Sequence, residues 1–291
     1  MPKIGVVGIS GGWSSEKLVD TVSEMTEFKL LIDIKKLCLN LQTGEAFYNG
    51  QDISKLDALI IKKIGSRYSP SLLDRLELLR YLNENGLKIF SAPIKILRVL
   101  DRLSCTVTLY TGNIPVPPTI ITEDMECALN TVEMYEEAVF KPLYTSKAKG
   151  MVVIKKGKDA QSKIEQFNQE NKIMYIQKKI NLNGQDLGVV FLGGKYITTY
   201  ARSNESTSWN TTILSGGKYI PYDPSDKIIE IAYNAQKLFG LDFTCVDVAE
   251  TKDGIYVFEV SAFGGFKGLE TARNINAAKL YTEYVLKKIS S

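Results

Sequence analysis

Strand-like and helix-like segments alternate along the first 91 residues, and this order restricts the possible folds more than any other feature. Short runs rich in Ile, Val and Leu predict strands at 3–8, 29–34, 57–62 and 87–91. Helical patterns near 15–26 and 71–85 separate them, and Ser69 is expected to cap the second helix. Such alternation predicts an open, largely parallel α/β sheet.

The pattern changes twice further along, so the 291 residues are expected to form three lobes. A helical segment from 92 ends at the Pro-rich stretch 112–118, which is the clearest boundary signal. Residues 119–180 mix strands and helices, and strands dominate from 181, apart from helices near 224–239 and 269–288. The predicted class is α/β with α+β lobes, divided as 1–91, 92–180 and 181–291.

The chain contains no histidine, which excludes Ser-His-Asp and Cys-His catalysis and histidine metal sites. Its chemistry must depend on carboxylates, Lys, Arg, Tyr, backbone amides or a bound cation, and Mg²⁺ fits that set best. The cysteines show no CxxC spacing, which favours reduced thiols in a cytoplasmic protein: Cys38, Cys105, Cys127 and Cys245.

The net charge of +3 gives no indication of a nucleic-acid partner. No apolar run approaches the ~18 residues that a membrane-spanning helix needs. We therefore expect neither nucleic acid nor membrane as a partner, and an oligomer is compatible with the sequence.

Two carboxylates stand opposite each other in a predicted C-terminal hairpin. Residues 243–251 and 255–261 have strand patterns, and the three residues 252–254 between them form a common hairpin turn. Pairing Thr251 with Ile255 sets Asp247 opposite Glu259, with both side chains on one face.

Like charges on one face repel unless something compensates them. A Mg²⁺ ion between Asp247 and Glu259 would do so, and the alternative is that one carboxylate pairs with a distant Lys or Arg. The same register sets Ser261 opposite Cys245, whereas a slip of one residue would separate the carboxylates.

Three other segments are candidates for contact with a charged ligand. A strand ending in Lys141 runs into a basic loop that could cradle phosphate or be a solvated turn, with Thr145, Ser146, Lys147 and Gly150. A turn after the first strand could hold an anion at a helix N-terminus or be a plain connection, with Ser10, Gly11, Gly12 and Trp13. A glycine-rich stretch after Glu259 lets a ligand approach the backbone or forms a flexible loop, with Gly264, Gly265, Lys267 and Gly268.

Taken in order, these segments resemble the RimK-like carboxylate–amine ligases of the ATP-grasp superfamily. The similarity runs over nearly the whole chain, through Ser91-Ala92-Pro93, Leu100-Asp101-Arg102, Ile114-Pro115-Val116-Pro117-Pro118-Thr119 and Phe140-Lys141-Pro142-Leu143. Longer phrases at 11–14, 101–105 and 259–268 are most similar to the ATP-grasp enzymes of the so-called GAK gene system, which is implied in peptide or protein modification.

The resemblance implies a Rossmann-like lobe ahead of two ATP-grasp lobes that enclose ATP. Arg102, Lys141 and the loop 145–150 would hold phosphate. A hinge would read adenine, comprising Gln177, Lys178, Lys179 and Ile180. Asp186 would lie at the ribose, and Arg202 near the transferred phosphate.

In the same family, Asp247 and Glu259 fall on the two acidic ligands of Mg²⁺, with Mn²⁺ as a possible substitute. Ser261 stands where the family usually has Asn, and a hydroxyl is a poorer ligand than an amide carbonyl. The resemblance therefore leaves open whether one or two ions bind.

The implied reaction is ATP-dependent amide formation. A substrate carboxylate would attack the γ-phosphorus to form an acyl phosphate, and an amine would then displace phosphate. The turn 9–15 and the loop 264–268 would hold the acceptor, with an amino acid added to a peptide, protein or cofactor carboxylate. A small-molecule kinase on the same fold and a nucleotide-binding module with degraded catalysis are the alternatives.

Overall fold

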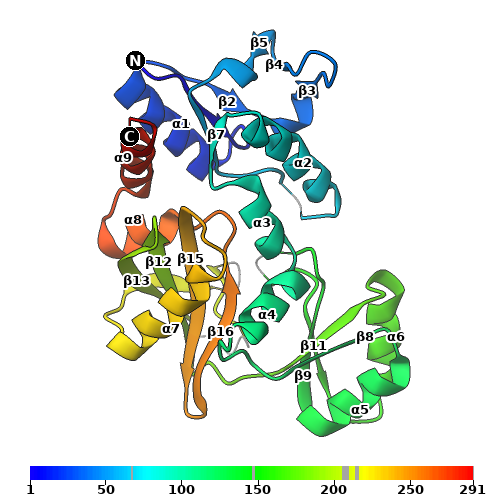
Figure 1. The fold of residues 1–291 in the computed structure, drawn as a ribbon. Helices are drawn as coiled ribbons and strands as arrows, with labels where there is room; N and C mark the ends of the chain where they lie inside the picture. Colours follow the sequence, from blue (N-terminus) through cyan, green and yellow to red (C-terminus); the bar gives the residue numbers. More distant parts are fainter. Residues whose placement is uncertain (67, 146–147, 205–209, 214–215, 291) are drawn as a thin grey trace.

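The computed structural model spans the chain and describes all residues except 67, 146–147, 205–209, 214–215 and 291. The N-terminal sheet lies at the top of Figure 1, the C-terminal sheet at the lower left and the central sheet at the lower right. Between them run α3 (Pro93–Leu100) and α4 (Arg102–Thr111), which begins where Asp101 Oδ1 accepts a 2.8 Å bond from the Ser104 amide. The predicted α/β class is confirmed.

The N-terminal sheet is parallel, in the order β2-β1-β6-β7. Its central strands, β1 (Ile4–Val7) and β6 (Ala58–Ile61), are buried along their whole length, as expected for a parallel sheet covered on both faces. The outer strands are β2 (Leu31–Ile32) and β7 (Lys88–Phe90), and the helices of this region are α1 (Trp13–Thr26) and α2 (Ser71–Glu84).

Two local features of this region differ from the prediction. The side chain of Ser69 does not cap α2, because its hydroxyl bonds to that of Ser71 at 2.7 Å. A small antiparallel sheet was not predicted, because strands this short show no periodic pattern. It consists of β3 (Cys38–Leu39), β4 (Ala46–Tyr48) and β5 (Gln51–Asp52), beside the 3₁₀ turns η1 (Ile34–Lys36) and η2 (Ile53–Lys55).

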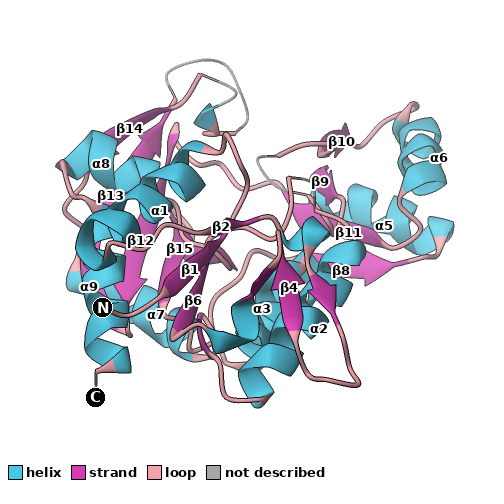
Figure 2. Ribbon diagram, turned by 90° about the horizontal axis from the view of Figure 1, so that it is seen from above, coloured by secondary structure: helices cyan, strands magenta, loops and turns pink. Residues whose placement is uncertain are grey.

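The central sheet is antiparallel, in the order β10-β9-β11-β8, and has its own hydrophobic core. Within that core the rings of Phe140 and Phe167 meet edge to face with centroids 5.4 Å apart. Figure 2 shows these strands and two helices standing to one side of the other sheets. The elements are β8 (Thr119–Thr122), α5 (Met125–Tyr135), β9 (Glu137–Lys141), β10 (Val152–Lys155), α6 (Ala160–Glu170) and β11 (Met174–Lys178).

The C-terminal sheet is antiparallel, in the order β14-β13-β12-β15-β16. Its strands are β12 (Gln185–Leu192), β13 (Lys195–Ser203), β14 (Lys218–Pro221), β15 (Phe243–Thr251) and β16 (Gly254–Val260), with α7 (Asp226–Lys237) before β15. The predicted final helix is in fact two, α8 (Lys267–Arg273) and α9 (Ala277–Ile289), because Asn274 adopts a left-handed conformation that ends α8.

The β15–β16 hairpin reaches the predicted pairing of Asp247 with Glu259 by a different route. Its turn is one residue shorter than expected, since Thr251 pairs with Gly254 rather than Ile255. A bulge at Phe258, between Val257 and Glu259, then restores the register. The predicted turn was wrong and the predicted carboxylate pair is confirmed, because the two one-residue differences cancel.

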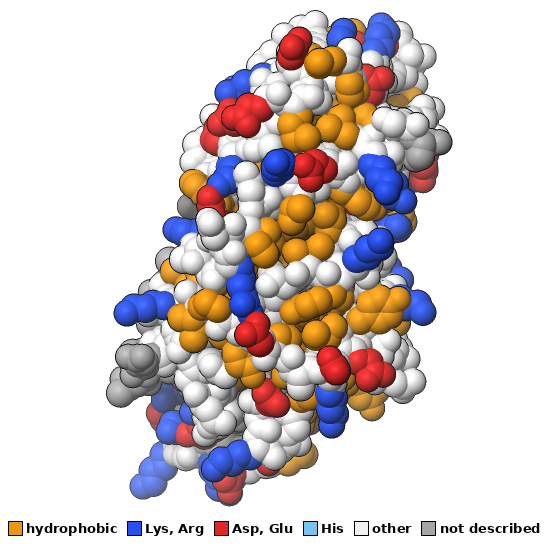
Figure 3. All heavy atoms as spheres, turned by 90° about the vertical axis from the view of Figure 1, so that its left-hand side faces the viewer, with side chains coloured by type: hydrophobic (Ala, Val, Ile, Leu, Met, Phe, Trp, Pro, Cys, Tyr) orange, Lys and Arg blue, Asp and Glu red, His pale blue; other side chains and the backbone are white. Residues whose placement is uncertain are grey.

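The N- and C-terminal sheets share one hydrophobic core, in which Val6 and Ile60 lie in the same cluster as Phe243 and Tyr281. Helix α9 packs beside α1, so the two chain ends lie near each other in Figure 1. The face in Figure 3 mixes acidic and basic side chains around apolar ones. Among the described residues, no helix has both the length and the apolar character needed to cross a membrane.

Candidate active site

Asp247 and Glu259 lie directly opposite each other on neighbouring strands, with Asp247 partly buried and Glu259 exposed. Burial raises the pKa of the Asp247 carboxyl to about 7, and Arg202 opposes this rise while the charge of Glu259 adds to it. In the part of the chain that is described, no group of three or more His, Cys, Asp or Glu side chains is arranged to hold a metal ion. A cation here would therefore be held by two carboxylates and would need further oxygens from a ligand such as a phosphate.

Arg202 joins Asp247 to a third carboxylate, that of Asp186. Its Nη2 lies 3.1 Å from Asp247 Oδ1, and its Nε donates to Asp186 Oδ1 at 3.0 Å. Asp186 also accepts a hydrogen bond from Thr211. The sequence left open that a distant Lys or Arg compensates one carboxylate of the pair. In the structure Arg202 does so at Asp247, and it also contacts the Asp186 carboxylate.

Lys141, at the end of β9, is buried and donates to the side-chain oxygen of Gln177 on β11. Gln177 in turn donates to Thr119 at 3.1 Å and to the Tyr175 hydroxyl at 3.2 Å. Burial lowers the pKa of Lys141 to about 7, with a further decrease from Arg102. An anion beside Lys141 would restore its charged form.

This site predicts that nucleotide binding takes up a proton. At about pH 8 the free Lys141 amine is mostly neutral, and a bound phosphate raises its pKa, so ADP without Mg²⁺ should bind with uptake of up to about one proton. Calorimetry in two buffers of different ionisation enthalpy measures this uptake. Lys141→Met should abolish it, and equal uptake by that variant would show that another group titrates.

Arg102 lies in a narrow crevice of about 40 Å³ together with Glu259 and Ser261. Its Nε is buried and has no hydrogen-bond partner among the described residues. A buried donor without an acceptor is unfavourable, and an anionic oxygen would satisfy it. The crevice thus suits a phosphate oxygen beside the Asp247–Glu259 pair.

The basic loop after Lys141 begins beside the same crevice, which Thr145 also lines. Thr145 Oγ1 donates to the Pro142 carbonyl at 3.4 Å, and Gly150 adopts a φ of +66°, where glycine is favoured. Ser146 and Lys147 lie outside the described residues.

The hinge after β11 lines a separate cavity of about 350 Å³, to which Lys179, Ile180 and Thr211 contribute. The amide of Lys178 donates to the Pro118 carbonyl at 2.8 Å, and that of Lys179 donates to Glu137 at 3.0 Å. Within the described residues the Ile180 amide donates to no acceptor. Among the hinge residues that the structure describes, Ile180 therefore has a backbone amide available to a ligand.

The two segments predicted to hold an acceptor lie side by side. An ion pair joins Lys17 on α1 to Glu270 on α8, which follows the glycine-rich loop. Lys17 also lies over the ring of Trp13, 5.4 Å from its centroid, and Trp13 is 46% exposed. Ser10 and Gly11 are exposed beside it, Gly12 precedes α1, and Gly11 donates to Glu16 at 2.8 Å.

Two glycines of the 264–268 loop are required by packing. A Cβ at Gly264 would lie 2.3 Å from Phe243, and one at Gly268 would lie 2.4 Å from Tyr200. Gly265 and Lys267 are exposed. The loop is therefore anchored at two points, and its exposed residues alternate with buried ones.

Three residues that follow β6 were not predicted from the sequence. Lys62 and Lys63 contact the 262–266 segment, and Tyr68 lines the crevice with Arg102 and Glu259. A signal was present, because the strand pattern 57–62 ends in Lys62 and is followed by Lys63, and ligands commonly bind at the carboxyl ends of parallel strands.

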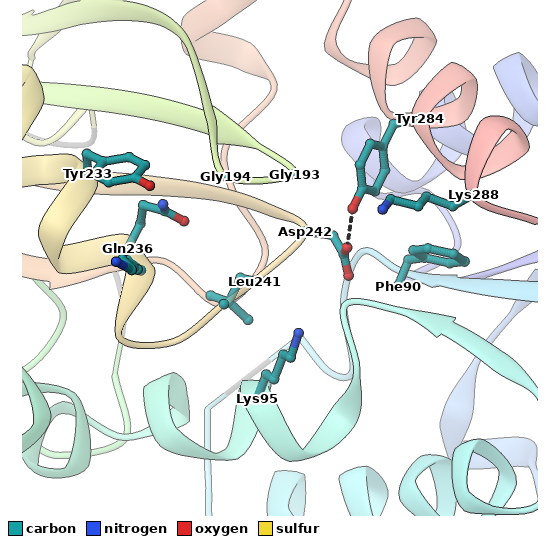
Figure 4. Close-up of a pocket in the computed structure, with 12 residues that line it drawn as sticks. Phe90, Lys95, Gly193, Gly194, Tyr233, Gln236, Leu241, Asp242, Tyr284 and Lys288 are labelled. Carbon is teal, nitrogen blue, oxygen red and sulfur yellow. Dashed lines mark hydrogen bonds between the residues drawn. The ribbon is translucent and has the colours of Figure 1, made fainter. Parts of the chain in front are cut away.

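A larger cavity, of about 430 Å³, lies at the opposite end of the C-terminal sheet (Figure 4). It adjoins the β12–β13 turn at Gly193 and Gly194, and within it Tyr284 donates to Asp242 at 2.6 Å. Asp242 is the only carboxylate among the described residues that line it. Because it lacks a carboxylate pair, this cavity is not the candidate nucleotide site.

Comparison with known proteins gives consistent matches. A model of the RimK-like ATP-grasp domain matches residues 99–285. The tetrahydromethanopterin:alpha-L-glutamate ligase of Methanosarcina acetivorans is 25% identical over 98% of this chain and 99% of its own.

Two solved structures illustrate the similarity of fold. ATP-grasp ligase PsnB, complexed with a phosphomimetic variant of its minimal precursor, Mg and ADP, has a TM-score of 0.76 and 18% identity, covering 98% of each chain. Macrocyclase MdnC, bound with precursor peptide MdnA from Microcystis aeruginosa MRC, has a TM-score of 0.73 and 16% identity, covering 99% of this chain and 100% of its own.

Proposed function

The chain belongs to the RimK-like ATP-grasp family and is an ATP-dependent carboxylate–amine ligase, and on that premise we propose that it adds an amino acid to a peptide, protein or cofactor carboxylate through an acyl phosphate. The observation that carries this proposal is the Asp247–Glu259 pair beside a crevice where the Arg102 donor has no partner. We also propose that residues 1–91 form the N-terminal lobe, 92–180 the central ATP-grasp lobe and 181–291 the C-terminal ATP-grasp lobe.

The nucleotide would lie between the central and C-terminal sheets. Its adenine would enter the 350 Å³ cavity, where the Ile180 amide has no acceptor among the described residues. Its phosphates would reach Lys141 and Arg102, with the loop 145–150 covering them. Asp247 and Glu259 would hold the metal, Mg²⁺ or Mn²⁺ in its place, which lowers the negative charge of the phosphates when bound.

The protein's contribution to the chemistry is positioning and charge. The substrate carboxylate attacks the γ-phosphorus in line, so one carboxylate oxygen becomes bonded to phosphorus and ADP leaves. The amine then attacks the acyl carbon, phosphate departs with that oxygen, and the proton lost from the amine nitrogen leaves on the phosphate. Arg202, already beside Asp247 at 3.1 Å, would shift toward the developing charge once a cation takes its place. Ser261 would supply at most a hydroxyl to a second ion.

Cysteine plays no part in this scheme. Burial raises the pKa of Cys105, which lines the crevice, to about 12, so its thiol is not a nucleophile at neutral pH. Cys245 has a similar pKa of about 12 for the same reason. All four thiols are free, as expected from the sequence.

A screen of ADP release tests the proposal. Amino acids are offered as amines together with peptides or cofactors that present a free carboxylate, and L-glutamate is tested first because a similar protein is a glutamate ligase. ADP release that requires both partners supports the proposed ligation. A stable phosphorylated carboxylate would indicate a kinase, and nucleotide binding without ADP release would indicate degraded catalysis.

A further inference from the structure

Lys62 is a buried lysine that the proposed reaction does not use. It follows β6 in the N-terminal sheet and is 1% exposed. Its Nζ donates to the carbonyl of Phe263 at 2.7 Å and to that of Gly264 at 2.5 Å. The same nitrogen lies 3.7 Å from the centroid of the Phe266 ring.

A lysine is rarely this buried unless its ammonium group is compensated. Burial lowers the pKa of Lys62 well below its usual value, so the position costs free energy that a Leu or Met would not. The compensation comes from two carbonyl dipoles and an aromatic face. If the side chain at position 62 only filled space in the core, an apolar residue would be expected there.

The carbonyls that Lys62 binds belong to a loop whose phenylalanine side chains are buried but whose backbone makes few other hydrogen bonds. Among the described residues, no backbone amide donates to the carbonyl of Phe263 or Gly264. The amides of residues 262–266 likewise donate to no acceptor there. Lys63, 5.4 Å from the Phe263 ring, is a second contact from the same segment. Lys62 is thus the principal hydrogen-bonded tie of this loop to the N-terminal sheet.

The loop also continues directly from the candidate metal strand. Glu259 and Ser261 precede it, and α8 with Glu270 follows it, paired with Lys17 near Trp13. The position of the 262–266 loop therefore determines how far the acceptor segments lie from the Asp247–Glu259 pair.

We propose that Lys62 is a positioning residue that holds the 262–266 loop as the acceptor wall of the site. The inference rests on the proposed function, because the acceptor is assigned to this loop. Lys62 touches neither ATP nor the reacting atoms in this scheme. Its loss should weaken use of the acceptor and leave nucleotide binding intact.

The experiment compares Lys62→Met with Ile60→Ala. Ile60 lies on β6 in the hydrophobic cluster that also contains Phe266. Its truncation therefore destabilises the contact between the N-terminal sheet and the loop without removing the Lys62 hydrogen bonds. The acceptor measured here is the amine, either L-glutamate or the amine that the ADP screen identifies. Lys62→Met should raise its KM by about tenfold or more, while the KM for MgATP stays within about twofold. Hydrogen exchange should accelerate by a similar factor at the amides of Ser261 and Glu270, which are hydrogen-bonded at the two ends of the loop. Ile60→Ala should lower the melting temperature and change neither KM.

Equal changes in both KM values, no change in either, or the same KM pattern in Ile60→Ala would overturn the proposal. If Lys62→Met does not fold, Lys62→Gln, which keeps a shorter donor, is measured in the same way. If the wild type releases no ADP with any pair of amine and carboxylate, the proposed function has failed. Unchanged hydrogen exchange at the ends of the loop in the Lys62 variant separately rejects the claim that Lys62 holds the loop.

Discussion

Replacing Asp247 by Asn together with Glu259 by Gln will abolish metal-dependent ATP turnover while the protein remains folded. Both changes keep side-chain shape and remove the charges that would hold the cation, so turnover should fall by roughly 10³-fold, as when charge stabilisation is lost in other active sites. Steady-state ADP release at saturating MgATP measures the effect.

The Asp247 change alone separates activity from stability. The folded-state pKa of Asp247 is raised to about 7, so binding of a proton to this carboxyl favours the folded state. That stabilisation is fully present at low pH and is lost as the pH rises through about 7. Asn has no charge to bury, so Asp247→Asn should not lower the melting temperature at about pH 8. Glu250→Gln is the matched control, because Glu250 lies on the same strand but is exposed and accepts a hydrogen bond from the Tyr222 hydroxyl. Normal metal-dependent turnover in the double variant would refute the metal assignment.

Replacing Arg202 by Met should cause the largest loss of stability of any change at the site. Arg202 lies between Asp186 and Asp247, both largely buried, and its removal leaves two carboxylates without a cation. Breaking a buried ion pair in this way costs about 3–5 kcal/mol. Thermal unfolding at neutral pH measures the loss, and turnover should fall as well because Arg202 is assigned to the transferred phosphate.

A second change distinguishes the two roles of Arg202. Asp186→Asn combined with Arg202→Met removes one of the stranded charges, so much of the stability should return while activity does not. Arg80→Met is the control for losing an arginine, because Arg80 pairs with Glu77 and Glu84 on the surface of α2 and should matter little. Recovery of activity with stability would show that Arg202 acts only through the fold.

The sequence predicted the order of the main elements because strand and helix periodicities are local properties. It predicted the Asp247–Glu259 pair through a turn and a register that were each wrong by one residue, since neither a two-residue turn at 252–253 nor a bulge at Phe258 has a signal of its own. The pairing was recovered because the two differences have opposite sign.

The contacts that define the site were harder to predict because they join distant parts of the chain. The sequence listed an Arg as one alternative partner of the pair, but only the fold shows that it is Arg202 and that Asp186 shares it. Likewise Lys62 and Gly264 are separated by 202 positions. The roles of the site residues and the narrower resemblance to the GAK system remain predictions.

Transfer of labelled oxygen tests the central claim most directly. The carboxylate partner found by the ADP screen is prepared with oxygen-18 in its carboxyl group, and the released phosphate is examined by phosphorus NMR. Attack of the carboxylate on the γ-phosphorus predicts that a labelled oxygen leaves with the inorganic phosphate as the amide forms. Amide formation that releases unlabelled phosphate, with the lost carboxylate oxygen appearing in water instead, would contradict the acyl-phosphate mechanism.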